Sequence, residues 1–231
     1  MRYALVFLLL TALVPITLKA QDLEVHANLN SGVYSFHGSG TTAVSRINGT
    51  TYTNNPYGTK GGLSYGLSLD VKKITRGKFI YGVDLGYEML RSKVKLDYND
   101  VIGDIASNFA GRTYLNTSFI NIFPFLGGRL NGGAQPFDLV AGMDIGHVLR
   151  AREDGDAKST DNAQFHIETS TDRKSLNTDI RPRIQLSTSF DRIGGYIGYS
   201  YGLKSYKGGM IGGSTEAYSR MLRFGLSYRL K

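Results

Sequence analysis

Cysteine and tryptophan are absent from the 231-residue chain, and it contains only 5 prolines. Without cysteine, the chain has neither disulfide bonds nor thiolate ligands, which excludes a small disulfide-stapled domain. Beyond the N-terminus, no stretch approaches the roughly 20 apolar residues that a membrane-spanning helix needs. The net charge is +8, but the basic residues form no single stripe, so no nucleic-acid partner is expected. Stability must therefore come from burial or from a closed sheet.

The first 20 residues are organised like a secretory signal peptide. Arg2 precedes a mostly apolar run, which Pro15 interrupts before the small residue Ala20. The run is too short to cross a bilayer as a helix, and no cysteine follows Ala20, which excludes lipoprotein processing. We therefore expect residues 1–20 to be a signal peptide and residues 21–231 to be the mature domain.

Glycine and aromatic residues are abundant, with 29 Gly, 15 Tyr and 11 Phe. This composition fits a barrel that is apolar on only one surface. Apolar and polar residues also alternate in segments of about the length of a tilted membrane strand, roughly 9 to 11 residues. In residues 79–89, Tyr81 and Leu85 lie on one face, whereas Asp84 and Glu88 lie on the other. Such alternation is typical of a strand with two different environments.

The alternation predicts eight strands, at about 23–36, 63–72, 79–89, 113–126, 137–149, 176–190, 196–203 and 218–230. Short connections at 73–78, 130–136 and 191–194 alternate with long polar ones at about 37–61, 91–112, 150–175 and 206–217. Short turns at one end and long loops at the other are typical of outer-membrane barrels. The expected fold is therefore all-β: an eight-stranded antiparallel transmembrane β-barrel, an up-and-down meander in a bacterial outer membrane.

Three stretches carry a resemblance to a known family: the Ala20-Gln21 junction, Ser118–Pro124 in a middle strand, and Arg223–Leu230 at the C-terminus. The mature chain resembles the small porin-like outer-membrane β-barrels of Bacteroidetes-type bacteria, which include the PorT-type proteins. The resemblance implies an integral barrel and, for a PorT-like member, an accessory role in protein secretion. Such barrels usually finish on an aromatic residue, whereas this chain finishes on Leu230-Lys231.

Charged residues on the polar faces are predicted to form a charge network in the lumen. An eight-stranded barrel leaves room only for side chains, and unpaired buried charge costs several kcal/mol. A paired, hydrogen-bonded plug is therefore expected, with a charged conduction path as the alternative. The acidic members are Glu24, Asp70, Asp84, Glu88, Asp138, Asp144 and Asp179, and the basic members are Lys72, Arg181, Arg183, Lys204, Arg223 and Arg229.

Other polar residues are candidates for catalysis, metal binding or contacts to lipid headgroups. His147 has no serine two residues away to share its face, so no catalytic residue is predicted. The acidic run 153–156, followed by Asp161 and Asn162, offers oxygen ligands to Ca²⁺ but lacks EF-hand spacing, so neither a metal nor another cofactor is predicted. Basic residues near the short turns suit anionic headgroups or a periplasmic partner: Lys73, Arg76, Lys78, Arg129 and Arg192.

The sequence thus predicts a non-enzymatic outer-membrane barrel that presents four extracellular loops and serves in binding, envelope integrity or assembly. Its expected partners are outer-membrane lipids, the barrel assembly machinery, and an extracellular ligand or envelope protein. The second hypothesis is a transport component, either a narrow pore or a PorT-like accessory of protein secretion. A lipid A-modifying enzyme is the third.

Overall fold

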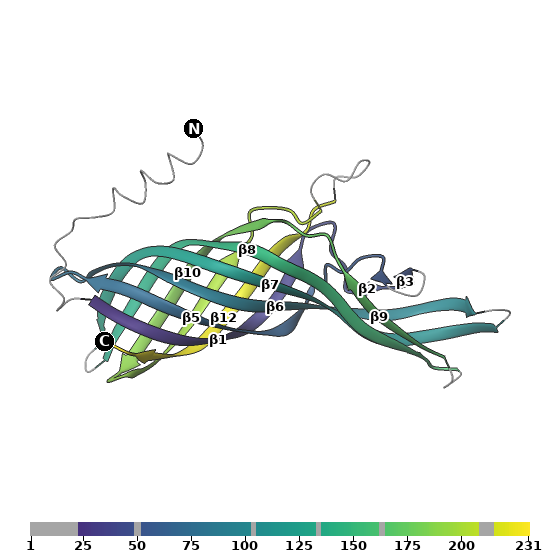
Figure 1. The fold of residues 1–231 in the computed structure, drawn as a ribbon, viewed down its shortest axis with the longest axis horizontal. Helices are drawn as coiled ribbons and strands as arrows, with labels where there is room; N and C mark the ends of the chain where they lie inside the picture. The colour runs from purple at the N-terminus through teal and green to yellow at the C-terminus, as the bar shows by residue number, and fades with distance from the viewer. Residues whose placement is uncertain (1–22, 49–51, 103–104, 133–134, 162–164, 208–214) are drawn as a thin grey trace.

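The computed structural model describes residues 23–48, 52–102, 105–132, 135–161, 165–207 and 215–231 (Figure 1). The expected signal peptide, residues 1–20, lies outside the described residues. In the described ranges, no helix is long and apolar enough to cross a membrane. The strands are β1 (Leu23–His37), β2 (Val44–Ser45), β3 (Ile47–Asn48), β4 (Tyr52–Thr53), β5 (Lys60–Ile74), β6 (Phe79–Ile102), β7 (Ile105–Gly132), β8 (Gln135–Ser159), β9 (His166–Asp172), β10 (Thr178–Phe190), β11 (Ile193–Tyr201) and β12 (Tyr218–Arg229).

Eight of these strands close into a ring. In the described chain, β1, β5, β6, β7, β8, β10, β11 and β12 each pair with two neighbours of the ring, always antiparallel. The first and last strands form the seam, from His26 opposite Arg229 to His37 opposite Tyr218. Closure provides partners for the backbone groups at both edges of the sheet. The predicted eight-stranded antiparallel barrel is confirmed.

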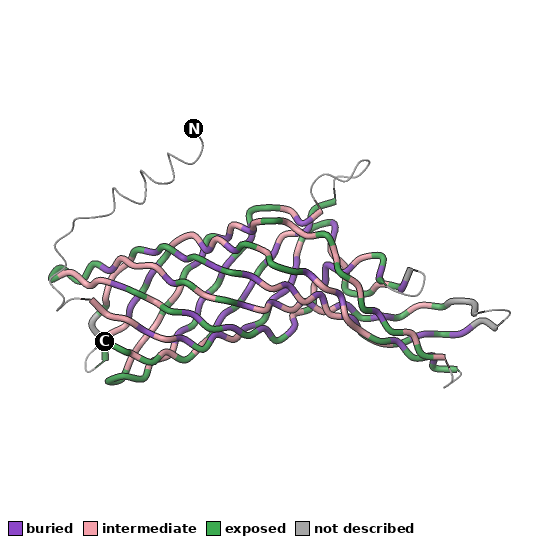
Figure 2. The backbone as a smooth tube through the Cα atoms, in the orientation of Figure 1, coloured by how far each residue is buried: buried purple, intermediate pink, exposed green. Residues whose placement is uncertain are grey.

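Burial alternates along the strands, so each strand has one face towards the lumen and one towards the outside (Figure 2). Leu67 is 60% exposed and Leu226 is 63% exposed, whereas the side chains of Arg181 and Arg223 are fully buried. Globular proteins in water show the opposite preference. An apolar outer band around a polar interior is the arrangement of a transmembrane β-barrel in the outer membrane. The chain is therefore an outer-membrane barrel, as the sequence predicted.

Tight turns connect the strands at one end of the barrel. Between β5 and β6, the backbone N–H of Lys78 donates to the carbonyl of Thr75, and Lys78 has a φ of 65°. Between β10 and β11, Asp191 has a φ of 52°. Residues 133–134 of the predicted turn between β7 and β8 lie outside the described part of the chain. The start of β1 and the C-terminus meet at this same end, since the N–H of Val25 donates to the carbonyl of Lys231.

The predicted loops at 91–112 and 150–175 are wrong in large part, because the strands continue through them. β6 pairs with β7 as far as Ile102 opposite Ile105. β8 runs on to Ser159, and β9 pairs with its residues Arg152 to Lys158. Figure 1 shows this sheet projecting beyond the barrel, and we call it the extension. Polar composition suggested loops here, but alternation and cross-strand pairing persist, and these maintain a strand.

The segment between β1 and β5 covers the inner face of the extension. Val44 of β2 pairs with Lys95 of β6 in parallel. Ile47 of β3 joins a buried cluster with Leu96, Phe109 and Ala157. The extension therefore has a covered apolar face and a polar face that continues the outer wall of the barrel.

Two register shifts lie where the barrel meets the extension. One falls between Gly61 and Tyr65 in the β5–β6 ladder, and the other falls at Ser118 and Phe119 in the β7–β8 ladder. A bulge adds one residue to a strand and thereby exchanges which side chains face outward. Beyond the second shift, Glu153 faces inward and is fully buried.

Replacing Leu85 by Arg should destabilise the barrel by roughly 2 to 4 kcal/mol, because this side chain is 52% exposed on the lipid-facing wall near mid-strand. Asp84→Asn is the control, since the neighbouring side chain faces the lumen and keeps its size. Urea titration of the refolded protein in detergent measures both free energies of unfolding. Equal losses would show that the assignment of faces is wrong.

Candidate functional site

The centre of the lumen holds a compact ion network. Nη2 of Arg223 lies 2.8 Å from Oε2 of Glu88 and 2.6 Å from Oδ2 of Asp144. Nη2 of Arg181 lies 3.0 Å from the same Asp144 oxygen, and its Nη1 lies 3.7 Å from Oδ2 of Asp179. We call these five residues the central network. They come from β6, β8, β10 and β12, so the network ties opposite parts of the wall together.

Arg183 and Asp84 lie beside the central network, and no ion pair of either is found within the described chain. The guanidinium of Arg183 lies 4.3 Å from the ring centre of Phe123 and 6.0 Å from that of Tyr196. It also donates a hydrogen bond to Gln185. Both Arg183 and Asp84 line a small cavity. Aromatic stacking, rather than a carboxylate, therefore holds the Arg183 side chain.

A second group of charges lies towards the short-turn end. Nζ of Lys72 lies 2.7 Å from Oδ2 of Asp138 and 3.6 Å from Oε2 of Glu24. Arg129 contacts the same two acids, at 2.7 Å and 3.4 Å. Arg129 was expected at the periplasmic mouth with the other basic turn residues, and it lies there, but its side chain contacts acids of the lumen. Arg129 lies opposite Asp138 on the inward face of β7, in line with buried Phe123 and Phe125, so its side chain reaches the acids.

His26 completes this group, although no role was predicted for it. Its ring nitrogens lie 3.7 Å from Glu24 and 3.7 Å from Asp70. We call Glu24, His26, Asp70, Lys72, Arg129 and Asp138 the mouth cluster. The first strand alternates less clearly than the others, which hid the inward position of His26.

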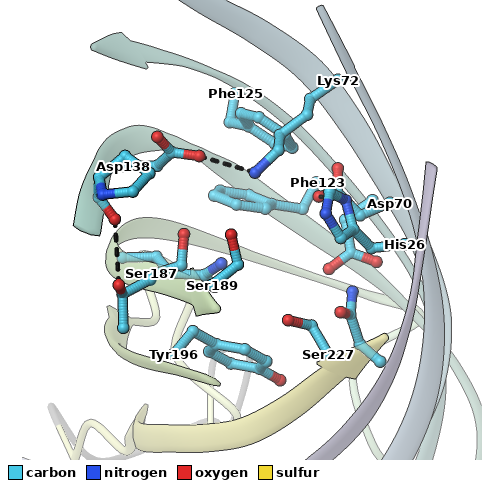
Figure 3. A pocket seen from close by; sticks show the side chains of 15 residues that line it. His26, Asp70, Lys72, Phe123, Phe125, Asp138, Ser187, Ser189, Tyr196 and Ser227 are labelled. Carbon is cyan, nitrogen blue, oxygen red and sulfur yellow. Dashed lines mark hydrogen bonds and ion pairs between the residues drawn. The ribbon is translucent and has the colours of Figure 1, made fainter. Parts of the chain in front are cut away.

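A small polar cavity lies beside the mouth cluster (Figure 3). In this view His26 and Asp70 lie on one side of it and Asp138 on the other, Lys72 reaches towards Asp138 from above, and Tyr196 and Ser227 lie below. The lining is mostly polar, which suits bound water better than an apolar ligand. The arrangement offers no nucleophile oriented by a base within the described residues.

Four aromatic side chains fill the lumen at the extension end. Phe36 packs edge-to-face on Tyr34, Tyr57 and Tyr206, with ring centres 5.2, 5.1 and 4.9 Å away. The hydroxyl of Tyr206 donates to Oδ2 of Asp179 at 2.8 Å, which joins these rings to the central network. We call the four residues the aromatic lid. Tyr57 and Tyr206 lie in segments expected as loops, so only their aromatic character within polar stretches could have drawn attention to them.

Two predicted members of the lumen network lie elsewhere. Lys204 is exposed, because β11 ends at Tyr201 and the chain then leaves the wall. Arg229 lies on the inward face at the rim, where its one ion pair in the described structure is to Asp191 at 3.9 Å. The sequence pattern indicated which face each residue occupies on a strand but not where the strand ends.

The other candidate groups do not converge on a site. His147 is exposed on the outer wall, opposite Ile120 and Thr178. Residues 153–156 form part of β8, so successive carboxylates alternate between faces. Glu153 points inward, 3.4 Å from Arg173, whereas Asp154 pairs with an arginine on the outer face. No cluster of three metal-ligating side chains exists among the described residues, and Asn162 lies outside them.

The remaining basic residues stay near the tight turns. Arg76, Lys78 and Arg192 are exposed there, and Lys73 is partly exposed. Their positions agree with contacts to anionic headgroups or to a periplasmic partner, and these two roles remain predictions.

Arg223→Ala should lower the free energy of unfolding by about 3 to 5 kcal/mol, because it leaves buried Glu88 and Asp144 short of a partner. Arg183→Ala also removes a buried arginine side chain, but it breaks no ion pair seen in the structure. It should therefore lower the free energy of unfolding clearly less. Chemical unfolding of the refolded protein, followed by circular dichroism, compares the two. Equal destabilisation would contradict the assignment of Arg223 as the centre of the network.

Comparison with known proteins yields weak likenesses in fold. No protein-family model and no curated protein sequence matches the chain. The attachment invasion locus protein Ail of Yersinia pestis, solved in complex with the heparin analogue sucrose octasulfate, is 11% identical with a TM-score of 0.41, over 91% of this chain and 100% of that one. Neisserial surface protein A is 9% identical with a TM-score of 0.34, over 88% and 96% of the two chains. Values this low carry no argument about function, which rests on the residues of the site.

Proposed function

We propose that this protein is a non-enzymatic outer-membrane barrel that does not conduct ions and acts by binding at its extracellular extension. The observation that carries the proposal is the contrast between a filled lumen and a large projecting sheet. The barrel serves as the membrane anchor, and the extension presents the functional surface. The finer roles in envelope integrity or assembly are variants of this binding role.

Buried side chains close the lumen. The side chains of Arg181 and Arg223 have no exposed area, and neither has Asp144. The aromatic lid lies against this network on the extension side. Eight strands enclose only enough space for side chains, whereas water-filled channels belong to barrels of about 16 strands. A narrow pore is therefore the weaker hypothesis.

The extension provides the surface for binding. Its outer face carries alternating rows of charge, such as Arg150 paired with Asp172 at 2.9 Å and Arg152 paired with Asp154 at 2.9 Å. Short turns face the periplasm in barrels of this type, so the extension lies outside the cell. A rigid sheet holds a binding surface at lower entropic cost than a set of mobile loops would.

The resemblance to PorT-type barrels supports a narrower form of the proposal, in which the partner belongs to a protein secretion system. A deletion strain that stops releasing secreted proteins would favour it, and normal secretion with altered envelope sensitivity would oppose it. The lipid A-modifying hypothesis is weaker, since His147 lies on the lipid-facing wall away from the lumen acids. Analysis of lipid A before and after incubation with the protein tests it directly.

The purified protein in planar bilayers should produce no stable conductance steps, because the central network and the aromatic lid block the path. A general porin in the same bilayers is the positive control. Large, reproducible steps from the folded protein would overturn the closed-barrel proposal and favour the pore.

An epitope tag inserted after Thr160, at the tip of the extension, should be labelled by antibody on intact cells. The same tag after Gly77, in the β5–β6 turn, should be labelled only after the outer membrane is permeabilised. Immunofluorescence with and without permeabilisation measures both. Labelling in the reverse pattern would invert the proposed orientation.

A further inference from the structure

A strip of positive charge lies on the outer wall where the barrel meets the extension. Lys60 of β5, Lys93 and Lys95 of β6 and Arg112 of β7 line one groove of about 590 Å³, and its described lining includes no acid. Lys95 pairs with Asp97 at 2.5 Å. For the other three, no ion pair is found among the residues that the structure describes. Lys60 and Lys93 are therefore uncompensated cations, whereas Arg112 has Asp156 opposite it in the β7–β8 ladder without forming an ion pair with it.

The strand register places these cations directly against one another. Lys60 lies opposite Lys93 in the β5–β6 ladder, and Lys95 lies opposite Arg112 in the β6–β7 ladder. Like charges at opposed positions destabilise a sheet. Two such pairs side by side are difficult to explain as a way to stabilise the extension, and a bound anion would offset their repulsion.

The first bulge is responsible for the position of Lys60. On β5 the buried, lumen-facing positions include Ser64 and Ser68, so unbroken alternation would turn Lys60 inward as well. The register shift between Gly61 and Tyr65 instead places Lys60 on the outer wall beside Lys93. Bulges often re-aim a side chain next to a functional site.

A second groove, of about 910 Å³, adjoins the first on the same wall. Its end within the apolar belt is lined by Tyr65, Tyr87 and Met89, and its polar end is lined by Arg91, Arg150 and the ion pair of Arg152 with Asp154. Arg91 donates to Oδ1 of Asn116 at 2.8 Å, and no ion pair involves it in the described ranges. The groove thus runs from apolar and aromatic side chains to a polar end with three arginines and one acid, at which Arg91 has no ion pair in the described ranges.

The depth of Arg91 and Lys93 matches that of lipid headgroups. Arg91 and Lys93 follow Met89 by two and four residues on β6, which is about 7 and 13 Å along the strand. With a strand tilt of about 40°, they lie roughly 5 and 10 Å beyond the belt along the barrel axis. The polar region of a bilayer begins at this depth.

We propose that this wall binds the phosphorylated headgroup of an outer-leaflet lipid. Lys60, Lys93 and Arg112 hold the phosphate with Arg91 beside them, and the acyl chains lie along Tyr65 and Tyr87. Lysine and arginine are the side chains that bind phosphate. The grooves are continuous with the apolar belt, which favours a lipid as the ligand. A soluble polyanion would need only the charged part of the grooves. The proposal rests on the outer-membrane placement proposed above.

Native mass spectrometry of the full mature protein, folded in detergent, tests the proposal with lipid A carrying two phosphates and with the same lipid dephosphorylated. The variant Lys60→Gln/Lys93→Gln/Arg112→Gln removes the cations. The variant Lys158→Gln/Lys174→Gln/Lys204→Gln is the matched control, since it removes equal charge from three exposed lysines that line neither groove. Circular dichroism and insertion into vesicles come first, and failure of the wild type there would count against the barrel function rather than this site.

Each cation near an anionic lipid is worth about fivefold in affinity. The groove variant should therefore bind phosphorylated lipid A more than about tenfold more weakly than the wild type, and the control should be nearly unchanged. Dephosphorylated lipid A should bind all three proteins equally weakly. Unchanged binding by the folded groove variant, or an equal loss in the control, would overturn the proposal. Groove-dependent binding of heparin without any preference for the phosphorylated lipid would assign the strip to a soluble polyanion instead.

Discussion

Backbone pairing across the seam between β1 and β12 is the constraint on which the whole structure depends. A sheet with two free edges cannot remain in lipid, because its unpaired N–H and C=O groups have no water to bond. The ladder from His26 opposite Arg229 to His37 opposite Tyr218 removes both edges. Once the ring is closed, every strand has one face towards the lumen and one towards the outside. The alternation of polar and apolar residues in the sequence matches these two faces.

Closure also decides how charge can be buried. The lumen is too narrow for bulk water, so arginines and carboxylates must satisfy one another, and the central network does this around Arg223 and Asp144. Glycines provide the necessary space. A Cβ on Gly146 would lie 2.8 Å from Oδ1 of Asn121 and 3.1 Å from Nη2 of Arg181. At Gly225 it would lie 2.5 Å from the ring of Tyr196. The abundance of glycine thus reflects close approach inside a filled barrel.

The two register shifts connect the membrane part to the extension. In the barrel, the outer face must be apolar, whereas beyond the membrane it must be polar and the covered face apolar. The shift on β8 exchanges the faces at this boundary, so that Glu153 turns inward and Arg152 turns outward. The shift on β5 brings Lys60 beside Lys93. The features that end the apolar belt therefore also create the strip of positive charge for which we propose a lipid partner.

The sequence by itself determined the strand number, the faces of most residues and the inward position of the central charges, because a period of two is a local property that needs no knowledge of partners. Residues 79–89 and 218–230 are clear cases. The tertiary structure decided where β6, β7 and β8 end, since strands persist as long as a neighbour pairs with them. It also decided that Arg183 stacks on Phe123, that Arg129 turns into the lumen, and that Tyr57 and Tyr206 close its end. These contacts join residues far apart in the chain, and only closure of the ring brings them within reach.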